Sequence, residues 1–309
     1  MKNKIDAHTH IGVDVARKKF GMTYLFDGDL LLKLAMDNNV SQIIALPALG
    51  QIICPDLGKP NHPQIYGLGG IPNLVNLNED KMFFECICGK KWWTKDPFEE
   101  ANKYLFRETR RLNSYEKLKL HPISWVHPLK PRVDKDIREF YEEYTIKGVK
   151  INSVIDKTDP RNYIESEFVD IIKEFDLPIL FHTDNESPAL PSTFLEFAKK
   201  TGIKCQLAHG CFGDKKSLEK ISGMDNVVVD LSPIEQYYKG RLLTKRKFST
   251  YRKYLEHVIS LCGKNKAIAA SNFYWCGWTP ESYSKCWKDF ESFGEEDILY
   301  RNAEIFWRL

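Results

Sequence analysis

Apolar positions along the chain recur in two alternating patterns, short buried runs typical of strands and longer stretches with helical spacing. The predicted strands cover residues 4–12, 41–47, 121–127, 147–152, 178–183, 204–210, 226–232 and 266–272. The predicted helices cover residues 29–38, 96–113, 134–144, 165–175, 192–201, 217–222, 251–262 and 297–307. Asp29 and Asp96 are the predicted N-caps of the first two helices, and Pro97 fits the first position of the second.

This alternation of strands and helices decides the predicted fold. No charge-rich or Gly/Ser-rich linker separates the units, so residues 1–309 are predicted to form a single (β/α)8 TIM barrel. An open doubly wound sheet is the alternative. It would need a Gly-rich phosphate-binding turn after the first strand, and the sequence has none there.

Residues 48–119 interrupt the pattern between the second and third strands. This aromatic-rich insertion contains a Gly-rich loop at 67–72 and the adjacent Trp92 and Trp93. Insertions of this length commonly form a lid or a wall of a binding pocket. A partner interface is the other interpretation.

Candidate metal ligands lie at the ends of the predicted strands. His8 and His10 are two positions apart on the first strand and therefore share a face, which suits half of a zinc site. Lys150, His182 and His209 stand at the carboxyl ends of the fourth, fifth and sixth strands. In a (β/α) barrel these ends share one mouth, where active sites are found, so we expect the five side chains to converge there.

The amino-acid composition limits which kinds of binding partner and which cellular location are expected for this protein. The net charge is only +3, from 45 basic and 42 acidic residues, so neither nucleic acid nor an anionic membrane is expected as a partner. No apolar run is long enough to span a membrane, and no export signal precedes the first strand, which predicts a cytoplasmic protein. The eight cysteines are predicted to be mostly buried free thiols.

Taken together, these motifs resemble the amidohydrolase superfamily of metal-dependent barrel enzymes. The nearest branch is the one that includes aminocarboxymuconate-semialdehyde decarboxylase. Asp-Ala-His-Thr-His at 6–10 is the first matching motif, and the other matching segments are 148–151, 180–182, 207–210, 270–273 and 298–306. The resemblance spans the chain apart from the insertion.

The resemblance implies one or two divalent metal ions, zinc before manganese or iron. His8 and His10 would hold the more buried ion, and His182 and His209 would hold a second ion or contact substrate. Lys150 matches a strand-four lysine that is often carboxylated when it bridges two metals. An unmodified, charged lysine has only donors, so carboxylation would convert it into an acidic ligand. The alternative role for Lys150 is to anchor an anionic substrate.

Asn272 departs from the family pattern. The family has an aspartate here that contacts metal and moves the proton of the attacking water, which an amide cannot do at neutral pH. Three interpretations stay open: an inactivated Asp-to-Asn form, a natural variant that uses Asp184 or His209 as base, or a barrel that binds without turnover. The otherwise intact ligand set favours the first.

The favoured activity is hydrolysis of an amide, ester or lactone bond in a small molecule or peptide by a metal-activated water. Nonoxidative decarboxylation, known in the same branch, and ligand binding without catalysis are the alternatives. Trp92, Trp93, Tyr237 and Arg241 are the candidate substrate-binding residues. The oligomeric state stays open, and the aromatic insertion is compatible with a homodimer.

Overall fold

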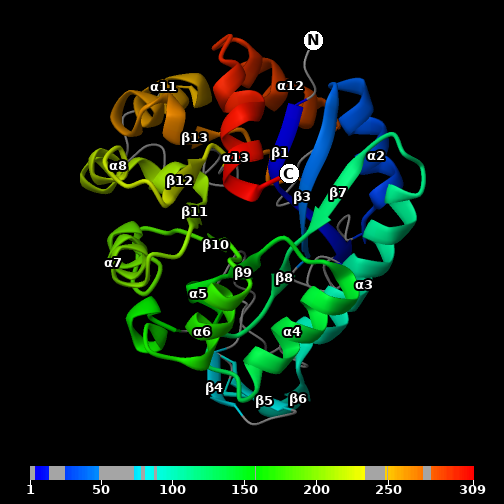
Figure 1. The fold of residues 1–309 in the computed structure, drawn as a ribbon, viewed down its shortest axis with the longest axis vertical. Coiled ribbons are helices and arrows are strands. Elements are labelled where there is room, and N and C mark those ends of the chain that lie inside the picture. Colours follow the sequence, from blue (N-terminus) through cyan, green and yellow to red (C-terminus); the bar gives the residue numbers. More distant parts are fainter. Residues whose placement is uncertain are drawn as a thin grey trace.

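A computed structural model describes residues 4–13, 25–48, 73–77, 81–86, 89–156, 158–233, 248, 250–273 and 280–309. Helices surround a central set of parallel strands (Figure 1). Across these ranges, no helix has both the length and the apolar character to cross a lipid bilayer.

Parallel strands form the centre of the molecule in the order expected from the sequence. Those near the amino terminus are β1 (Lys4–Val13), β3 (Val40–Pro47) and β7 (Lys119–Pro122). The others are β8 (Ser124–Trp125), β9 (Val149–Ile151), β10 (Ile179–Phe181), β11 (Cys205–Leu207), β12 (Val227–Asp230) and β13 (Ala267–Ile268). They pair as β1-β3-β7 and as β13-β12-β11-β10-β9-β8, and the short β2 (Leu25–Phe26) adds to β1 antiparallel.

Hydrogen bonds connect the two sheets at both of their ends. The predicted third strand is divided at Ile123, so that β7 pairs with β3 and β8 pairs with β9. Ile123 N donates to Ala45 O at 2.9 Å, which continues the first sheet towards β8. At the other end Ala7 N donates to Ala269 O at 3.1 Å. The first and last strands of the chain are therefore neighbours.

Helices follow most strands, as the sequence predicts. They are α2 (Gly28–Asp37), α3 (Pro97–Asn113), α4 (Val133–Tyr144), α5 (Ser153–Asp156), α6 (Glu167–Glu174), α7 (Pro191–Thr201), α8 (Lys215–Ile221), α11 (Tyr251–Cys262), α12 (Pro280–Glu291) and α13 (Asn302–Trp307). The prediction of Asp29 as the first N-cap is wrong, because Asp27 occupies that position and accepts a hydrogen bond from Asp29 N. Helix α12 was not predicted.

A β-bulge in β1 sets the direction of the first histidines. Between Asp6 and Thr9 the strand advances three residues while its partner β3 advances two, from Ile43 to Ala45. Ala7 packs with the apolar side chains in the interior that the strands surround. Asp6 points the other way and accepts a hydrogen bond from the hydroxyl of Tyr283. The extra residue shifts the alternation, so His8 faces the same interior as Ala7. In a regular strand Ala7 and His8 would face opposite sides, and the bulge is the reason that they do not.

Apolar side chains pack on both faces of the strands. One layer lies between the strands and the outer helices. The other fills the space between the strands with small and branched side chains, including Ile5, Leu180 and Val228. Helix α13 closes this inner layer with Phe306 and Trp307 (Figure 1).

The described part of the insertion contains an antiparallel sheet rather than only irregular structure. It consists of β4 (Asn73–Leu77), β5 (Lys81–Glu85) and β6 (Lys91–Lys95). Met82 and Phe84 are buried in a cluster with Phe98, Trp125 and Ile155, which attaches this sheet beside β8 and α5 (Figure 1). Residues 49–72, 78–80, 87 and 88 of the insertion lie outside the described part.

Candidate metal centre

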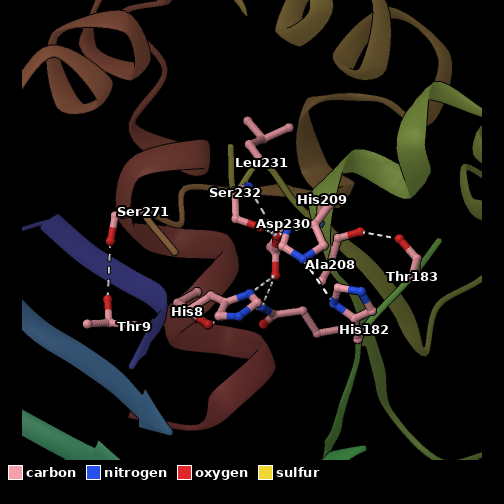
Figure 2. A network of polar contacts seen from close by, with 12 residues as sticks. His8, Thr9, His182, Thr183, Ala208, His209, Asp230, Leu231, Ser232 and Ser271 are labelled. Atoms are coloured by element: carbon pink, nitrogen blue, oxygen red, sulfur yellow. Dashed lines mark hydrogen bonds and ion pairs between the residues drawn. The ribbon is translucent and has the colours of Figure 1, made fainter. Parts of the chain in front are cut away.

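Asp230 stands at the centre of the candidate site, at the end of β12 (Figure 2). Its Oδ2 lies 2.9 Å from Nδ1 of His8 and 2.9 Å from Nε2 of Gln206. Its Oδ1 accepts hydrogen bonds from the backbone N–H groups of His209 and Ser232 at 2.9 and 3.0 Å. The Ser232 hydroxyl donates to the same oxygen. These donors stabilise the ionised carboxylate.

The charge on Asp230 determines which nitrogen of His8 carries a proton. Burial opposes ionisation, but His8 and the surrounding donors keep the pKa of Asp230 well below its ordinary value. An ionised carboxylate can only accept hydrogen bonds, so His8 Nδ1 must be the donor. His8 Nε2 then keeps its lone pair, and it is buried without a hydrogen-bond partner among the described residues.

A second hydrogen-bonded chain runs from Asp230 to His182. The Ser232 hydroxyl donates its only proton to Asp230, so its oxygen accepts from His209 Nδ1 at 2.8 Å. His209 Nε2 is then an acceptor, and His182 Nδ1–H donates a hydrogen bond to it at 3.1 Å. His182 Nε2 is left with a lone pair and has no hydrogen-bond partner in the described ranges. One carboxylate therefore orients two unprotonated imidazole nitrogens.

Burial keeps the histidines of the site neutral. The ring centroid of His8 lies 5.3 Å from that of His10 and 5.5 Å from that of His209, and the centroids of His182 and His209 are 4.9 Å apart. Desolvation lowers the pKa values of His8, His10 and His182 below the usual range and that of His209 to about 3. Neutral imidazole is the form that binds metal ions.

Lys150 places a buried amine in the candidate site. It is 1% exposed, and its Nζ has no hydrogen-bond partner within the described structure. Desolvation lowers its pKa to about 7, with Asp230 and Asp156 opposing that shift. A substantial fraction of Lys150 is therefore uncharged at neutral pH, which is the reactive form of an amine.

The remaining predicted ligands are placed differently. His10 points its Nδ1 at Pro47 O, 3.1 Å away. His209 is adjacent to the other rings, but its Nε2 accepts a hydrogen bond from His182 Nδ1. In this arrangement His209 orients the ring of His182. Among the described residues no set of three or more His, Cys, Asp or Glu side chains converges on one point as metal ligands.

The structure also locates the predicted catalytic residues. Asn272 is 5% exposed, and its backbone N–H donates to His8 O at 2.7 Å, so it lies next to the first ligand strand. The carboxylate of Asp184 accepts a hydrogen bond from Asn185 N within its own loop.

The predicted substrate-binding residues are only partly described. Trp92 is half-buried against the cluster around Trp125, whereas Trp93 pairs with Phe83 on the other face of the small sheet and is 46% exposed. Tyr237 and Arg241 lie outside the described residues.

Sequence reasoning missed Asp230, Gln206 and Ser232. Asp230 and Ser232 follow the rule that located the histidines, since they lie at the end of the seventh strand and just after it, whereas Gln206 is in the middle of β11 and does not. Asp230 ends the run Val-Val-Val-Asp, and an acid at the mouth end of an apolar strand is a detectable signal. Carboxylates at strand ends therefore belong beside His and Lys among the candidate residues of an α/β fold with parallel strands.

A left-handed turn immediately follows the sixth strand. His209, Gly210, Cys211 and Phe212 all have φ between +51° and +58°. For residues other than glycine this conformation costs about 1–2 kcal/mol each. Tyr254 stabilises the turn by donating its hydroxyl to His209 O at 2.7 Å. The turn and the hydrogen bond from Tyr254 therefore fix the backbone position of His209.

Gly210→Ala is expected to destabilise the protein by about 1–3 kcal/mol beyond the cost of its backbone conformation. A Cβ at Gly210 would lie 2.5 Å from the hydroxyl oxygen of Tyr254, the group that holds His209. Gly202→Ala is the matched control, because Gly202 has φ +72° and a Cβ there would meet nothing within 4 Å. Urea unfolding of both variants measures the difference, and equal losses would contradict the steric explanation.

Comparison with known proteins supports the fold. No family model and no curated protein matches the sequence. Solved structures do match. A zinc-bound amidohydrolase from Burkholderia multivorans is similar at 11% identity over 100% of both chains, with a TM-score of 0.64. A putative 2-pyrone-4,6-dicarboxylic acid hydrolase from Pseudomonas putida matches at 14% identity over 99% of this chain and 97% of its own, with a TM-score of 0.59.

A decarboxylase is among the similar structures as well. The dihydroxybenzoic acid decarboxylase from Polaromonas sp. JS666, with bound manganese and the inhibitor 2-nitroresorcinol, matches at 11% identity. The match covers 100% of this chain and 98% of that one, with a TM-score of 0.60. The resemblance to the amidohydrolase superfamily inferred from sequence is therefore confirmed at the level of the fold.

Proposed function

We propose that this chain is a metal-dependent enzyme of the amidohydrolase superfamily whose (β/α)8 barrel carries one catalytic centre at the carboxyl ends of its strands. One observation supports this most strongly. The Nε2 atoms of His8 and His182 are buried, unprotonated and without hydrogen-bond partners in the described structure, and the Asp230 network enforces that state. Burying such atoms costs about 1–3 kcal/mol each, which a bound ligand would offset.

The donor types of these residues suit a divalent metal, although among the described residues no three His, Cys, Asp or Glu side chains already converge as a ligand set. His8 and His182 would supply neutral nitrogen donors, with His10 beside them, and a carboxylated Lys150 would supply oxygen. A bound divalent ion lowers the pKa of its water towards about 7 and polarises a substrate carbonyl. The chain itself excludes bulk water, since His8, His10, His209 and Lys150 are each at most 5% exposed. It also holds His8, His209 and His182 in one tautomer each through Asp230, and Pro47 O accepts a hydrogen bond from His10 Nδ1–H.

Hydrolysis of an amide, ester or lactone is the first candidate reaction. Lys150 favours it, because a buried amine with a pKa of about 7 is uncharged often enough to react with carbon dioxide. The amine lone pair forms the N–C bond while one C–O π bond of carbon dioxide opens, the released N–H proton passes to water, and the product is a carbamate with one negative charge. A carbamate of this kind could bridge two metal ions.

Decarboxylation is supported equally by the similar structures, which include dihydroxybenzoate decarboxylases as well as hydrolases. That reaction needs one metal and no bridging group. Lys150 would then stay unmodified and bind the substrate carboxylate as a cation. Metal stoichiometry and the state of Lys150 separate the two reactions.

The metal content of the protein, measured by elemental mass spectrometry after incubation with zinc or manganese, tests the proposal. We expect about one or two ions per chain, and intact mass should show the added carbon dioxide if the number approaches two. His8→Gln and His182→Gln should each remove most of the bound metal. His257→Gln is the control, because His257 contacts Phe248 away from the site. Wild-type protein that takes up no metal would refute the proposal.

A further inference from the structure

We propose that Gln206 is a positioning residue for the metal centre and that Trp307, on the carboxyl-terminal helix, fixes its orientation. The inference rests on the proposed metal-dependent function. It extends the site from the strand ends to the opposite, closed side of the inner layer, where α13 packs.

Gln206 links three parts of the chain. Its side-chain Nε2 donates to Asp230 Oδ2 at 2.9 Å and to the backbone oxygen of Ala7 at 3.0 Å. Its Oε1 accepts from the indole Nε1 of Trp307 at 2.8 Å. The side chain of Gln206 is fully buried, so no water competes for these bonds.

Trp307 determines which way the Gln206 amide points. The indole N–H can only donate, so it must face the amide oxygen. The amide NH2 group then faces Ala7 O and Asp230, both of which can only accept. A flipped amide would place oxygen against two acceptors and N–H against a donor. The orientation of Gln206 is therefore uniquely determined by its neighbours.

The packing around Trp307 keeps the indole at this place. Trp307 is 2% exposed and lies in the inner apolar layer. A Cβ at Gly148 would lie 2.5 Å from both Pro178 O and Trp307 Cζ3, so the residue before β9 must be glycine for the neighbouring strand and the ring to approach this closely. Gly148 thus accommodates the ring that orients Gln206.

The hydrogen bonds of Gln206 also affect the position of His8. Ala7 O belongs to the β-bulge that turns His8 inwards, and Asp230 Oδ2 is the oxygen that binds His8 Nδ1. Gln206 therefore holds both the backbone before His8 and the carboxylate that orients its ring. Without Gln206, Asp230 Oδ2 loses a donor and the bulge loses a hydrogen bond, so the His8 ring gains freedom to rotate and to change tautomer.

The first measurement is the tautomer of His8 in metal-free protein, read from imidazole ¹⁵N NMR shifts. Wild type should show His8 protonated at Nδ1 alone. Gln206→Met, which keeps the volume and removes the polar atoms, should show a mixture of tautomers. Trp307→Phe should shift His8 in the same direction by a smaller amount. Gln42→Met is the matched control, because it removes a side-chain bond to His121 on neighbouring strands without touching Asp230.

The second measurement is zinc affinity by competition with a chelator. Gln206→Met should weaken binding about 10- to 100-fold, and Gln42→Met should leave it unchanged. The inference is overturned if His8 in both Gln206→Met and Trp307→Phe keeps the wild-type tautomer. If Gln206→Met does not fold, the tautomer in Trp307→Phe decides. If wild type binds no zinc but the tautomers shift as expected, the proposed function fails, and what stands is that Gln206 and Trp307 orient His8.

Discussion

Asn272→Asp is expected to raise turnover by about 100- to 10,000-fold on a substrate that the metal-loaded protein binds. The strand-eight position is where the family places its proton-transferring acid, and an amide cannot take a proton at neutral pH. Asn272 adjoins His8 through its backbone N–H, a bond that does not depend on its side chain. If the chain is an inactivated form, a carboxylate there would supply the base for the proposed reaction.

The backbone at Asn272 should tolerate this change. Its φ of +50° lies in the left-handed region, which Asn and Asp both adopt more readily than other residues with side chains. The two side chains have nearly the same volume, so little repacking is required. We therefore expect the variant to fold, and any change in rate should report chemistry.

Turnover of a lactone dicarboxylate and of a dihydroxybenzoate, followed by absorbance, measures the effect. The exposed Asn162→Asp serves as a control for the added charge. A compound that binds by calorimetry yet shows no gain in Asn272→Asp would contradict the interpretation of an inactivated form. Asp184 or His209 would then be tested as the base, and lack of turnover in every form would leave a binding protein.

Asp230→Asn should have the largest effect on stability, a loss of about 3–5 kcal/mol together with a weakening of zinc binding by about 100-fold. The carboxylate accepts from His8, Gln206, Ser232 and the backbone of His209. An amide at this position would turn its NH2 group towards some of these donors and leave them unsatisfied in a buried site. The proton of His8 would also lose its fixed location.

Urea unfolding of metal-free protein measures the stability, and chelator competition measures the affinity. Asp225→Asn is the control, because the Asp225 side chain is fully exposed and its change should stay within about 0.5 kcal/mol. If Asp230→Asn unfolds within about 1 kcal/mol of wild type, Asp230 does not organise the site as described.

The parallel strands and most helices were predictable because burial leaves a strong pattern. Strands such as β12, with Val227, Val228 and Val229, are apolar on both faces and allow few other interpretations. Capping was less certain, because Asp27 and Asp29 are equally good caps and only the backbone decides between them.

Other features depend on tertiary contacts that leave no local pattern. The bulge in β1 is invisible in an alternating sequence, because it arises from pairing with β3. The antiparallel sheet of the insertion was missed because charged residues stand at both ends of its two aromatic strands, Lys81 and Glu85 on β5 and Lys91 and Lys95 on β6, which weakens the strand signal. The hydrogen-bonded chain from Asp230 to His182 joins residues from three strands, so only the fold reveals it.

The junction between the first and last strands also has a consequence for biosynthesis. Asp6 accepts a hydrogen bond from the backbone of Ser271, which is 265 positions later in the chain. At ribosomal rates of about 5–20 residues per second, β1 leaves the ribosome on the order of tens of seconds before its partner exists. During that time one edge of β1 is unpaired and prone to aggregation, so a chaperone that covers it should increase the yield of folded protein.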